Sequence, residues 1–167
     1  MKNIGLISDT HGFVHPKLTS FFKDVDEIWH AGDIGDYRII DQLSNTKPFR
    51  AVYGNIDDTN IRKKFPEYLV FTIEKVTVVI LHIGGYPGKY TTLAKQLINQ
   101  ESPDLFISGH SHILKAMYDK KHKLLHLNPG AAGKQGLHQH ITFMRFFIDK
   151  ERIHDLEVAN HPRQGLS

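Results

Sequence analysis

Five short apolar segments of the sequence are each followed by polar side chains that can bind a metal ion. The candidates are Asp9, His11, Asp33, Asn55, His82, His110 and His112. They are carboxylate, imidazole and amide groups, which suit Mn, Fe, Ni, Co or Zn without selecting among them. The chain has no cysteine, which excludes thiolate ligands and disulfides. Seven candidates are too many for one ion and favour two neighbouring ions.

The spacing of the candidates carries further information. Asp9 and His11 are separated by one residue, and so are His110 and His112. An extended backbone would point both members of each pair to the same side. Asp33 has two carboxylate oxygens and could therefore bridge two ions.

The elements that must position these residues follow an α/β pattern. We expect buried strands at Ile4–Ser8, Glu27–His30, Phe49–Tyr53, Thr77–Leu81 and Asp104–Ser108. Helix-like segments lie between them near Pro16–Lys23, Tyr37–Leu43 and Thr91–Gln100. Ligands of open α/β sheets bind at the carboxyl ends of the strands, so we expect the candidates to converge at one sheet edge.

The second half of the chain is predicted to contain strands without intervening helices. These are Lys115–Asp119, Leu124–Asn128, Ile141–Asp149 and Arg152–Val158. We interpret them as a meander that feeds a second sheet. Residues 1–158 are expected to form one domain, and residues 159–167 a polar, frayed C-terminal tail.

Each candidate also has an ordinary structural explanation. Asp9 could be a turn or helix N-cap residue, and Asp57 and Asp58 could begin a short helix. His82 could be a hydrogen-bonded core histidine. The pair of His110 and His112 favours metal binding, since two imidazoles on one side of a strand end are costly unless bonded. The coincidence of all five segments favours a common site over five independent structural roles.

Composition restricts the partners. A net charge of +3 and a pI near 9.0 could attract phosphate esters but fall short of the basic footprint of a nucleic-acid-binding protein. The sequence has no apolar run of membrane-spanning length and does not begin like a signal peptide, so we expect a cytoplasmic protein with no membrane contact. A homo-oligomer is compatible with the sequence.

The motifs SDTH, Gly32-Asp33, Gly54-Asn55-Ile56-Asp57, His82 and GHSH resemble, in order and spacing, those of the calcineurin-like metallophosphoesterases. The likeness is greatest to the small YfcE-type bacterial phosphodiesterases and covers residues 1 to about 158. It implies a four-layer α/β/β/α sandwich of two mixed β-sheets flanked by helices. It also implies a dinuclear, metal-dependent phosphoesterase, in the first place a phosphodiesterase, that hydrolyses a small-molecule phosphate ester with a metal-bridging hydroxide.

The resemblance also implies roles for individual residues. Asp9, His11 and His112 resemble the ligands of one ion, and Asn55, His82 and His110 those of the other, with Asp33 bridging. Manganese is the favoured metal. Asp33, Asn55 and Asp57 are the expected catalytic residues, and Asn55, Asn128 and Gly130 are expected to bind substrate. His30 and His126 are interpreted as supporting or core residues, whereas His138 and five further histidines are assigned no role.

Two departures from the family pattern affect the function. Ile56 stands where larger members carry a histidine that acts on the leaving group, and general acids contribute on the order of 10²–10⁴-fold. The fourth motif, HIGGYPG, keeps His82 but lacks the family's second histidine. Lys134, in the loop after Asn128, could meet a phosphate. The alternative function is a catalytically weak scaffold that binds a protein partner, similar to the retromer subunit of this family.

Overall fold

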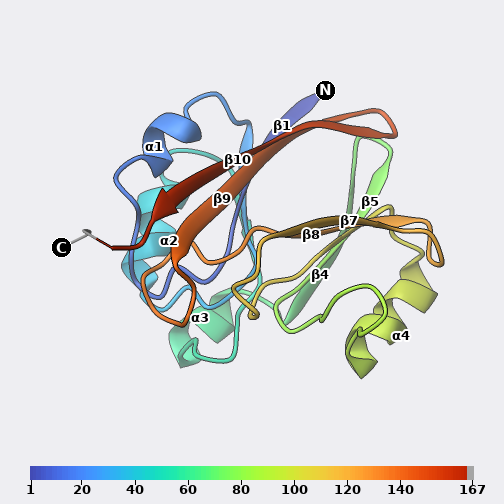
Figure 1. Cartoon of the computed structure of the whole chain (residues 1–167), viewed down its shortest axis with the longest axis horizontal. Coiled ribbons are helices and arrows are strands. Elements are labelled where there is room, and N and C mark those ends of the chain that lie inside the picture. Colours follow the sequence, from blue (N-terminus) through green and yellow to red (C-terminus); the bar gives the residue numbers. More distant parts are fainter. Residues whose placement is uncertain (165–167) are drawn as a thin grey trace.

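The protein consists of two five-stranded sheets that pack face to face with helices outside them, as the computed structural model of residues 1–164 shows (Figure 1). The first sheet has the order β10-β9-β1-β2-β3. Its strands are β1 (Lys2–Ile7), β2 (Glu27–His30), β3 (Phe49–Ala51), β9 (His140–Asp149) and β10 (Arg152–Pro162). β1, β2 and β3 are parallel, whereas β9 runs antiparallel to β1 and to β10.

The second sheet has the order β4-β5-β6-β8-β7. Its strands are β4 (Tyr68–Ile73), β5 (Val76–Leu81), β6 (Leu105–Ile107), β7 (Lys115–Asp119) and β8 (Leu124–Asn128). β5, β6 and β8 are parallel, and β4 and β7 are antiparallel edge strands. Both sheets are therefore mixed.

Three apolar clusters hold the layers together. The cluster between the sheets includes Leu6, Trp29, Ile80 and Ile107, all of them fully buried. A second cluster packs three helices on the outer face of the first sheet: α1 (Leu18–Phe21), α2 (Tyr37–Ser44) and α3 (Thr59–Lys64). The third places α4 (Thr92–Glu101) on the outer face of the second sheet. The order helix, sheet, sheet, helix confirms the expected four-layer sandwich.

The helices begin where capping residues allow it. Asp36 accepts a hydrogen bond from the N–H of Arg38 at the start of α2, and Asp58 accepts one from Ile61 in α3. Such bonds satisfy amides that lack a partner inside the helix. None of the helices in the described part of the chain has the length and apolar character that a bilayer crossing requires.

The second half of the chain differs from the expected meander. β7 and β8 join the second sheet, but β9 returns to the first sheet and pairs with β1 from Lys2 to Leu6. β4 was not expected, because its alternating exposed and half-buried residues lack a continuous apolar run. β10 extends to Pro162 and pairs with β9 throughout that region, so residues 159–162 are strand and not frayed tail. Residues 165–167 lie outside the described part.

Candidate metal centre

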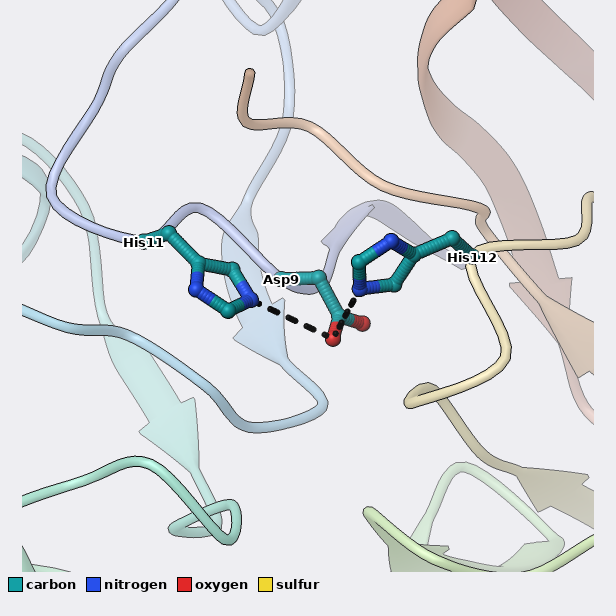
Figure 2. Close-up of side chains that lie close together, drawn as sticks. All are labelled: Asp9, His11 and His112. Carbon is teal, nitrogen blue, oxygen red and sulfur yellow. Dashed lines mark hydrogen bonds and ion pairs between the residues drawn. The ribbon is translucent and has the colours of Figure 1, made fainter. Parts of the chain in front are cut away.

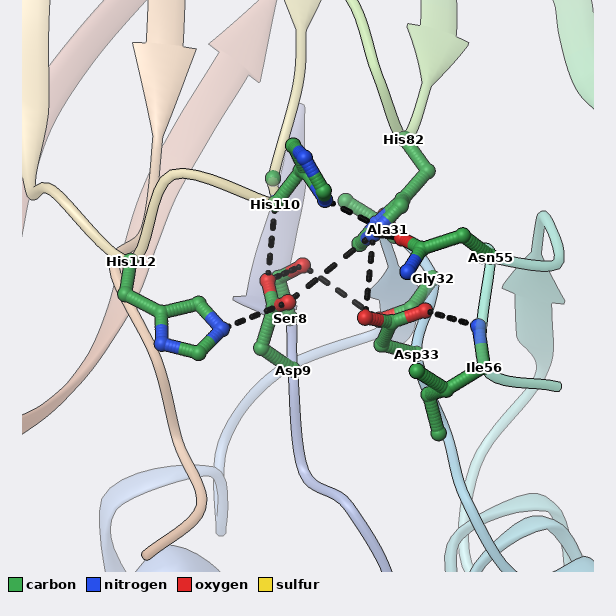
Figure 3. A network of polar contacts seen from close by, with 12 residues as sticks. Ser8, Asp9, Ala31, Gly32, Asp33, Asn55, Ile56, His82, His110 and His112 are labelled. Atoms are coloured by element: carbon green, nitrogen blue, oxygen red, sulfur yellow. Dashed lines mark hydrogen bonds and ion pairs between the residues drawn. The ribbon is translucent and has the colours of Figure 1, made fainter. Parts of the chain in front are cut away.

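The carboxyl ends of strands from both sheets meet at one place and bring the candidate residues together. Figure 2 shows one group, Asp9, His11 and His112, and Figure 3 shows its neighbour. The neighbouring group is Asp33, His82 and His110. In each group, one possible ligand atom per residue lies within 4.8 Å of the others. Asn55 completes the second group, since its Oδ1 lies 3.1 Å from His82 Nε2 and 3.0 Å from His110 Nδ1.

The backbone at the site is left-handed at five of these residues, not extended. The φ angles are +54° at Asp9, +46° at His11, +55° at Asp33, +67° at His110 and +60° at His112. Strands β1, β2 and β6 end before these residues, so the extended pairs expected from the sequence do not form. This backbone costs about 1–2 kcal/mol per non-glycine residue, and its concentration in one place is typical of a functional site.

The side chain of Asp9 is fully buried. One of its oxygens accepts hydrogen bonds from neighbouring groups, and the other faces the candidate histidine ligands. Oδ2 accepts hydrogen bonds from Ser8 Oγ (2.6 Å) and from the N–H of His110 (3.1 Å). Oδ1 faces the Nε2 atoms of His112 at 3.1 Å and of His11 and His82 at 3.9 Å each. Ser8 was not recognised from the sequence, since a serine at a strand end carries no signal of this role.

Asp33 is arranged in the same way. Its Oδ1 accepts a hydrogen bond from the N–H of Ile56 at 3.0 Å, which ties it to the loop that carries Asn55. Its Oδ2 faces His82 Nε2 at 3.2 Å and His11 Nε2 at 3.5 Å, one histidine from each group. This carboxylate lies between the two groups, where a bridging ligand is needed.

Both ring nitrogens of His82 face hydrogen-bond acceptors. Its Nδ1 donates to the carbonyl oxygen of Ala31 at 2.7 Å, so the neutral ring has an unprotonated Nε2. That lone pair points at Asp33 Oδ2 and at Asn55 Oδ1, which also carry lone pairs. A cation between these three atoms would convert the repulsion into attraction, and the set therefore fits a divalent metal ion.

His11 gives a second indication of the same kind. Its Nε2 is buried and has no hydrogen-bond partner among the described residues. It lies nearest to the free oxygens of Asp33 and Asp9. Buried polar atoms in native proteins are nearly always satisfied, and an orphan between two carboxylates fits a metal ligand.

The electrostatic environment keeps the carboxylates of the site ionised and favours positive charge beside them. Burial alone would raise the pKa of Asp9, but contacts with His11 and His112 outweigh burial and hold it below its usual range. Contact with Asp9 raises the pKa of His11. Burial opposes the charged form of His82, but Asp33 and Asp9 raise its pKa overall. The carboxylates are thus ionised and attract positive charge to the site.

Glycines are required where the backbone approaches these side chains. A Cβ at Gly32 would lie 2.6 Å from His82 Nδ1 and 2.7 Å from its Cγ, and one at Gly54 would collide with the carboxylate of Asp33. Gly32 also has a φ of +100°, a conformation that side chains rarely adopt.

Asp57 contacts the backbone of the loops that carry Asp33 and Asn55. It is 4% exposed and accepts hydrogen bonds from three backbone N–H groups, those of Ile34, Gly35 and Gly54, at 3.2, 2.8 and 2.8 Å. It thereby joins the loop after β2 to the loop after β3. Its partners are backbone amides, so its effect on catalysis would come through Asp33 and Asn55. The catalytic role of Asp57 stays a prediction.

Asn128 and Gly130 lie in a loop that braces the histidine pair. Asn128 Nδ2 donates to the carbonyl oxygen of Gly109 at 3.0 Å and to Ser111 Oγ at 3.1 Å, and its Oδ1 accepts the N–H of Gly130 at 3.0 Å. These bonds use the side chain of Asn128 to hold the turn before His110. Its contact with substrate stays a prediction.

The two histidines interpreted as supporting or core residues are buried. His30 contacts Thr10 Oγ1 through Nε2 at 2.9 Å and accepts the N–H of Gly32 through Nδ1, and burial lowers its pKa to about 3. His126 stacks on Phe106, and burial lowers its pKa to about 4. Neither belongs to the two candidate groups.

Residues 1–151 match the calcineurin-like phosphoesterase superfamily domain. The chain belongs to this superfamily. A probable metallophosphoesterase of Methanothermobacter thermautotrophicus is 32% identical over 135 residues, which are 77% of this chain and 76% of that protein. The family assignment made from the motifs is thereby confirmed.

Solved structures of other proteins share the fold. An archaeal phosphodiesterase superposes with a TM-score of 0.73 at 23% identity over 94% of this chain and 99% of its own. Vps29 from Entamoeba histolytica in complex with Zn²⁺ superposes with a TM-score of 0.67 at 18% identity, covering 97% of this chain and 99% of its own. At these identities the likeness establishes the fold and leaves the activity to be argued from the site.

Proposed function

We propose that this protein is a phosphodiesterase that uses two divalent transition-metal ions, with manganese as the favoured ion and a small-molecule phosphate ester as substrate. The observation that carries the proposal is the convergence of two neighbouring groups of carboxylate, imidazole and amide atoms on Asp33, above all His82 Nε2 with Asp33 Oδ2 and Asn55 Oδ1. Membership of a metallophosphoesterase family supports it. A cytoplasmic location and the absence of nucleic-acid substrates belong to the same proposal.

The candidate residues would form two neighbouring metal sites. Asp9, His11 and His112 would hold one ion, and Asn55, His82 and His110 the other, while Asp33 would contact both. When bound, such ions activate water, neutralise phosphate charge and align the ester for in-line displacement. The protein holds both carboxylates in place. Asp33 Oδ1 accepts the N–H of Ile56, and Asp9 Oδ2 accepts the hydroxyl of Ser8.

A groove beside the second group gives room for the organic part of an ester. It has a volume of about 440 Å³, and Asn55 and His82 are among its lining residues. Apolar side chains, including Leu93 and the 42%-exposed Ile83, lie along it together with Arg62. Arg62 packs over the ring of Tyr53 at 4.7 Å. A diester that places one substituent in this groove would present its phosphorus to the candidate metal groups.

The leaving group would receive little help with protonation. Ile56, where larger relatives carry a histidine, is 46% exposed and offers no proton. Asp57 does not replace it, because its oxygens accept three backbone amides. We therefore expect aryl esters, whose leaving groups need no proton, to react much faster than alkyl esters, by about 10²–10⁴-fold.

Hydrolysis of an aryl phosphodiester by the Mn²⁺-loaded protein tests the proposal, with Asp33→Asn as the active-site variant. Asp36→Asn is a matched control, since Asp36 lies three residues after Asp33, caps α2, and asparagine is also a good cap. We expect Asp33→Asn to lower kcat/KM by at least about 100-fold, because electrostatic groups at a reacting phosphate are worth several kcal/mol. Equal turnover by Asp33→Asn and wild type would refute the assignment.

A scaffold function is the second candidate, favoured by the match to Vps29 over 97% of this chain. It predicts stable metal binding with no turnover of aryl phosphodiesters or monoesters. The presence of both candidate ligand groups, with Asp33 between them, argues for catalysis, since binding a protein partner does not require two neighbouring metal sites.

A further inference from the structure

We infer that His138 is a positioning residue that fixes the proton of His112 on Nδ1 and leaves Nε2 free to bind a metal ion. The inference rests on the metal-binding part of the proposed function and not on the reaction. His138 lies in the loop between β8 and β9, and the sequence offered no reason to assign it a role.

Three successive contacts connect Asp9, His112, His138 and the carbonyl group of Gly133. His112 Nε2 faces Asp9 Oδ1 at 3.1 Å, and Figure 2 shows the other ring nitrogen turned away from that carboxylate. This second nitrogen, Nδ1, lies 3.2 Å from Nδ1 of His138. On the far side of the His138 ring, Nε2 lies 2.8 Å from the carbonyl oxygen of Gly133.

The chemistry of these atoms determines where each proton lies. A carbonyl oxygen only accepts, so Nε2 of His138 must carry a hydrogen. In the neutral ring Nδ1 of His138 is then an acceptor, and the facing Nδ1 of His112 must donate to it. Without a cation Nε2 can carry a second hydrogen and donate it to Asp9 Oδ1. When a metal ion takes the place of that hydrogen, the Nδ1 proton bonded to His138 leaves Nε2 with its lone pair toward the ion. Ligating histidines usually donate their other ring N–H to such a partner, which fixes both tautomer and ring orientation.

The loop that carries His138 is held directly against the candidate ligands. The N–H of Ala132 donates to the carbonyl oxygen of Ser8 at 2.9 Å, and that of Gly133 to the carbonyl oxygen of Asp9 at 3.0 Å. Gly133 thus links the backbone of Asp9 to the ring of His138. Gly136 covers the two facing nitrogens, since a Cβ there would collide with Nδ1 of His112.

The end of β10 fixes the other side of this loop. Arg163 donates through Nη1 to the carbonyl oxygens of Lys134 (3.1 Å) and Gly136, and its N–H donates to that of Gln139 at 2.9 Å. The loop is therefore bonded before and after His138. A loop fastened in this way can hold an imidazole in one orientation.

Nuclear magnetic resonance of the imidazole nitrogens tests the position of the proton in the diamagnetic Zn²⁺-loaded protein, without any need for activity. We expect long-range ¹H–¹⁵N correlations to show a slowly exchanging proton on Nδ1 of His112 in wild type. His138→Ala removes the acceptor and should shift the resonance of this proton and speed its exchange with solvent. His138→Asn should restore slow exchange, because its Oδ1 can accept where Nδ1 stood.

Metal affinity provides the second readout, by Mn²⁺ titration with a competing chelator. We expect His138→Ala to weaken one of two binding steps by about 10–100-fold, as the loss of such supporting partners does elsewhere, and His138→Asn to recover most of the affinity. His140→Ala is the matched control, because His140 is an exposed histidine two residues away. Thermal unfolding of each variant shows whether the fold is retained.

Three results would overturn the inference. These are the absence of a slowly exchanging Nδ1 proton on His112 in the Zn²⁺-loaded wild type, an unchanged resonance and exchange rate of that proton in His138→Ala, or an equal loss of affinity in His138→Ala and His140→Ala. Failure of the proposed phosphodiesterase is distinguishable from these, since it would leave both the Nδ1 proton and the stepwise metal binding as described while no ester is cleaved.

Discussion

Replacing Gly32 by alanine is a sharp test of the account, because it adds one methyl group next to a single candidate ligand. The new Cβ would lie 2.6 Å from His82 Nδ1, 2.7 Å from Cγ and 2.8 Å from Cβ of the same residue. Real Cβ atoms do not approach closer than 3.0 Å, and ordinary contact begins at 3.4 Å. His82 must therefore move by 0.4–0.8 Å.

A displacement of this size exceeds what a metal ligand tolerates. Coordination distances in sound sites lie within about 0.2 Å of their ideal values. The movement would also stretch the bond from His82 Nδ1 to the carbonyl oxygen of Ala31, now 2.7 Å. We expect the ion held by Asn55, His82 and His110 to bind much more weakly, and kcat/KM for an aryl phosphodiester to fall by about 10²-fold.

Gly88→Ala is the matched control. Gly88 has a φ of +87°, close to the +100° of Gly32, so both variants pay a similar backbone strain. A Cβ at Gly88 meets nothing within 4 Å. The assay is metal content per chain after gel filtration together with kcat/KM at saturating Mn²⁺. If Gly32→Ala retained two ions and wild-type turnover, the assignment of His82 as a ligand would be wrong.

Three further predictions concern stability. The pKa of His30 is lowered to about 3 and that of His126 to about 4. As the pH falls below about 6.5, the unfolded chain therefore protonates these histidines before the folded protein does. The free energy of unfolding of the metal-free protein should then decrease by up to about 1.4 kcal/mol per pH unit for each histidine. As the pH rises above 6.5, the free energy of unfolding should also decrease. The pKa values of His11 and His82 are raised in the folded protein, so the stability that their protonated forms contribute is lost as they deprotonate. Urea denaturation in EDTA from pH 4.5 to 9 should thus show a maximum near pH 6.5, and a monotonic rise would contradict it. Mn²⁺ at 100 times its Kd should add about 2.7 kcal/mol per site, reversed by chelation and absent if no site exists. Asp57→Ala should cost about 3 kcal/mol or more in urea denaturation, because three amides lose their acceptor, whereas a loss below 1 kcal/mol would refute the bracing role.

The fold could be predicted from the sequence to the extent that buried strands reveal themselves by apolar runs. Segments such as Thr77–Leu81 meet this condition, and β5 is found there. β4 does not, since alternate residues of an edge strand face solvent. The return of β9 to the first sheet was not predictable from local pattern, because strand pairing depends on contacts distant in the chain.

The convergence of the candidate residues could be predicted from the sequence, but the structural reason differs from the one first given. The residues converge because strands of two sheets end at the same place, and five of them are held in left-handed backbone. Period-two spacing would have placed His110 and His112 in one group, whereas the structure places them in two. Supporting residues such as Ser8 and His138 were missed, because their roles depend on a single hydrogen bond across the fold.

The most direct test of the central claim is anomalous diffraction from a crystal of this protein grown with Mn²⁺. We predict two peaks roughly 3.5–4 Å apart. One should lie within bonding distance of Asp9, His11 and His112, the other of Asn55, His82 and His110, with Asp33 contacting both. A single peak, or peaks away from these residues at saturating metal, would contradict the account.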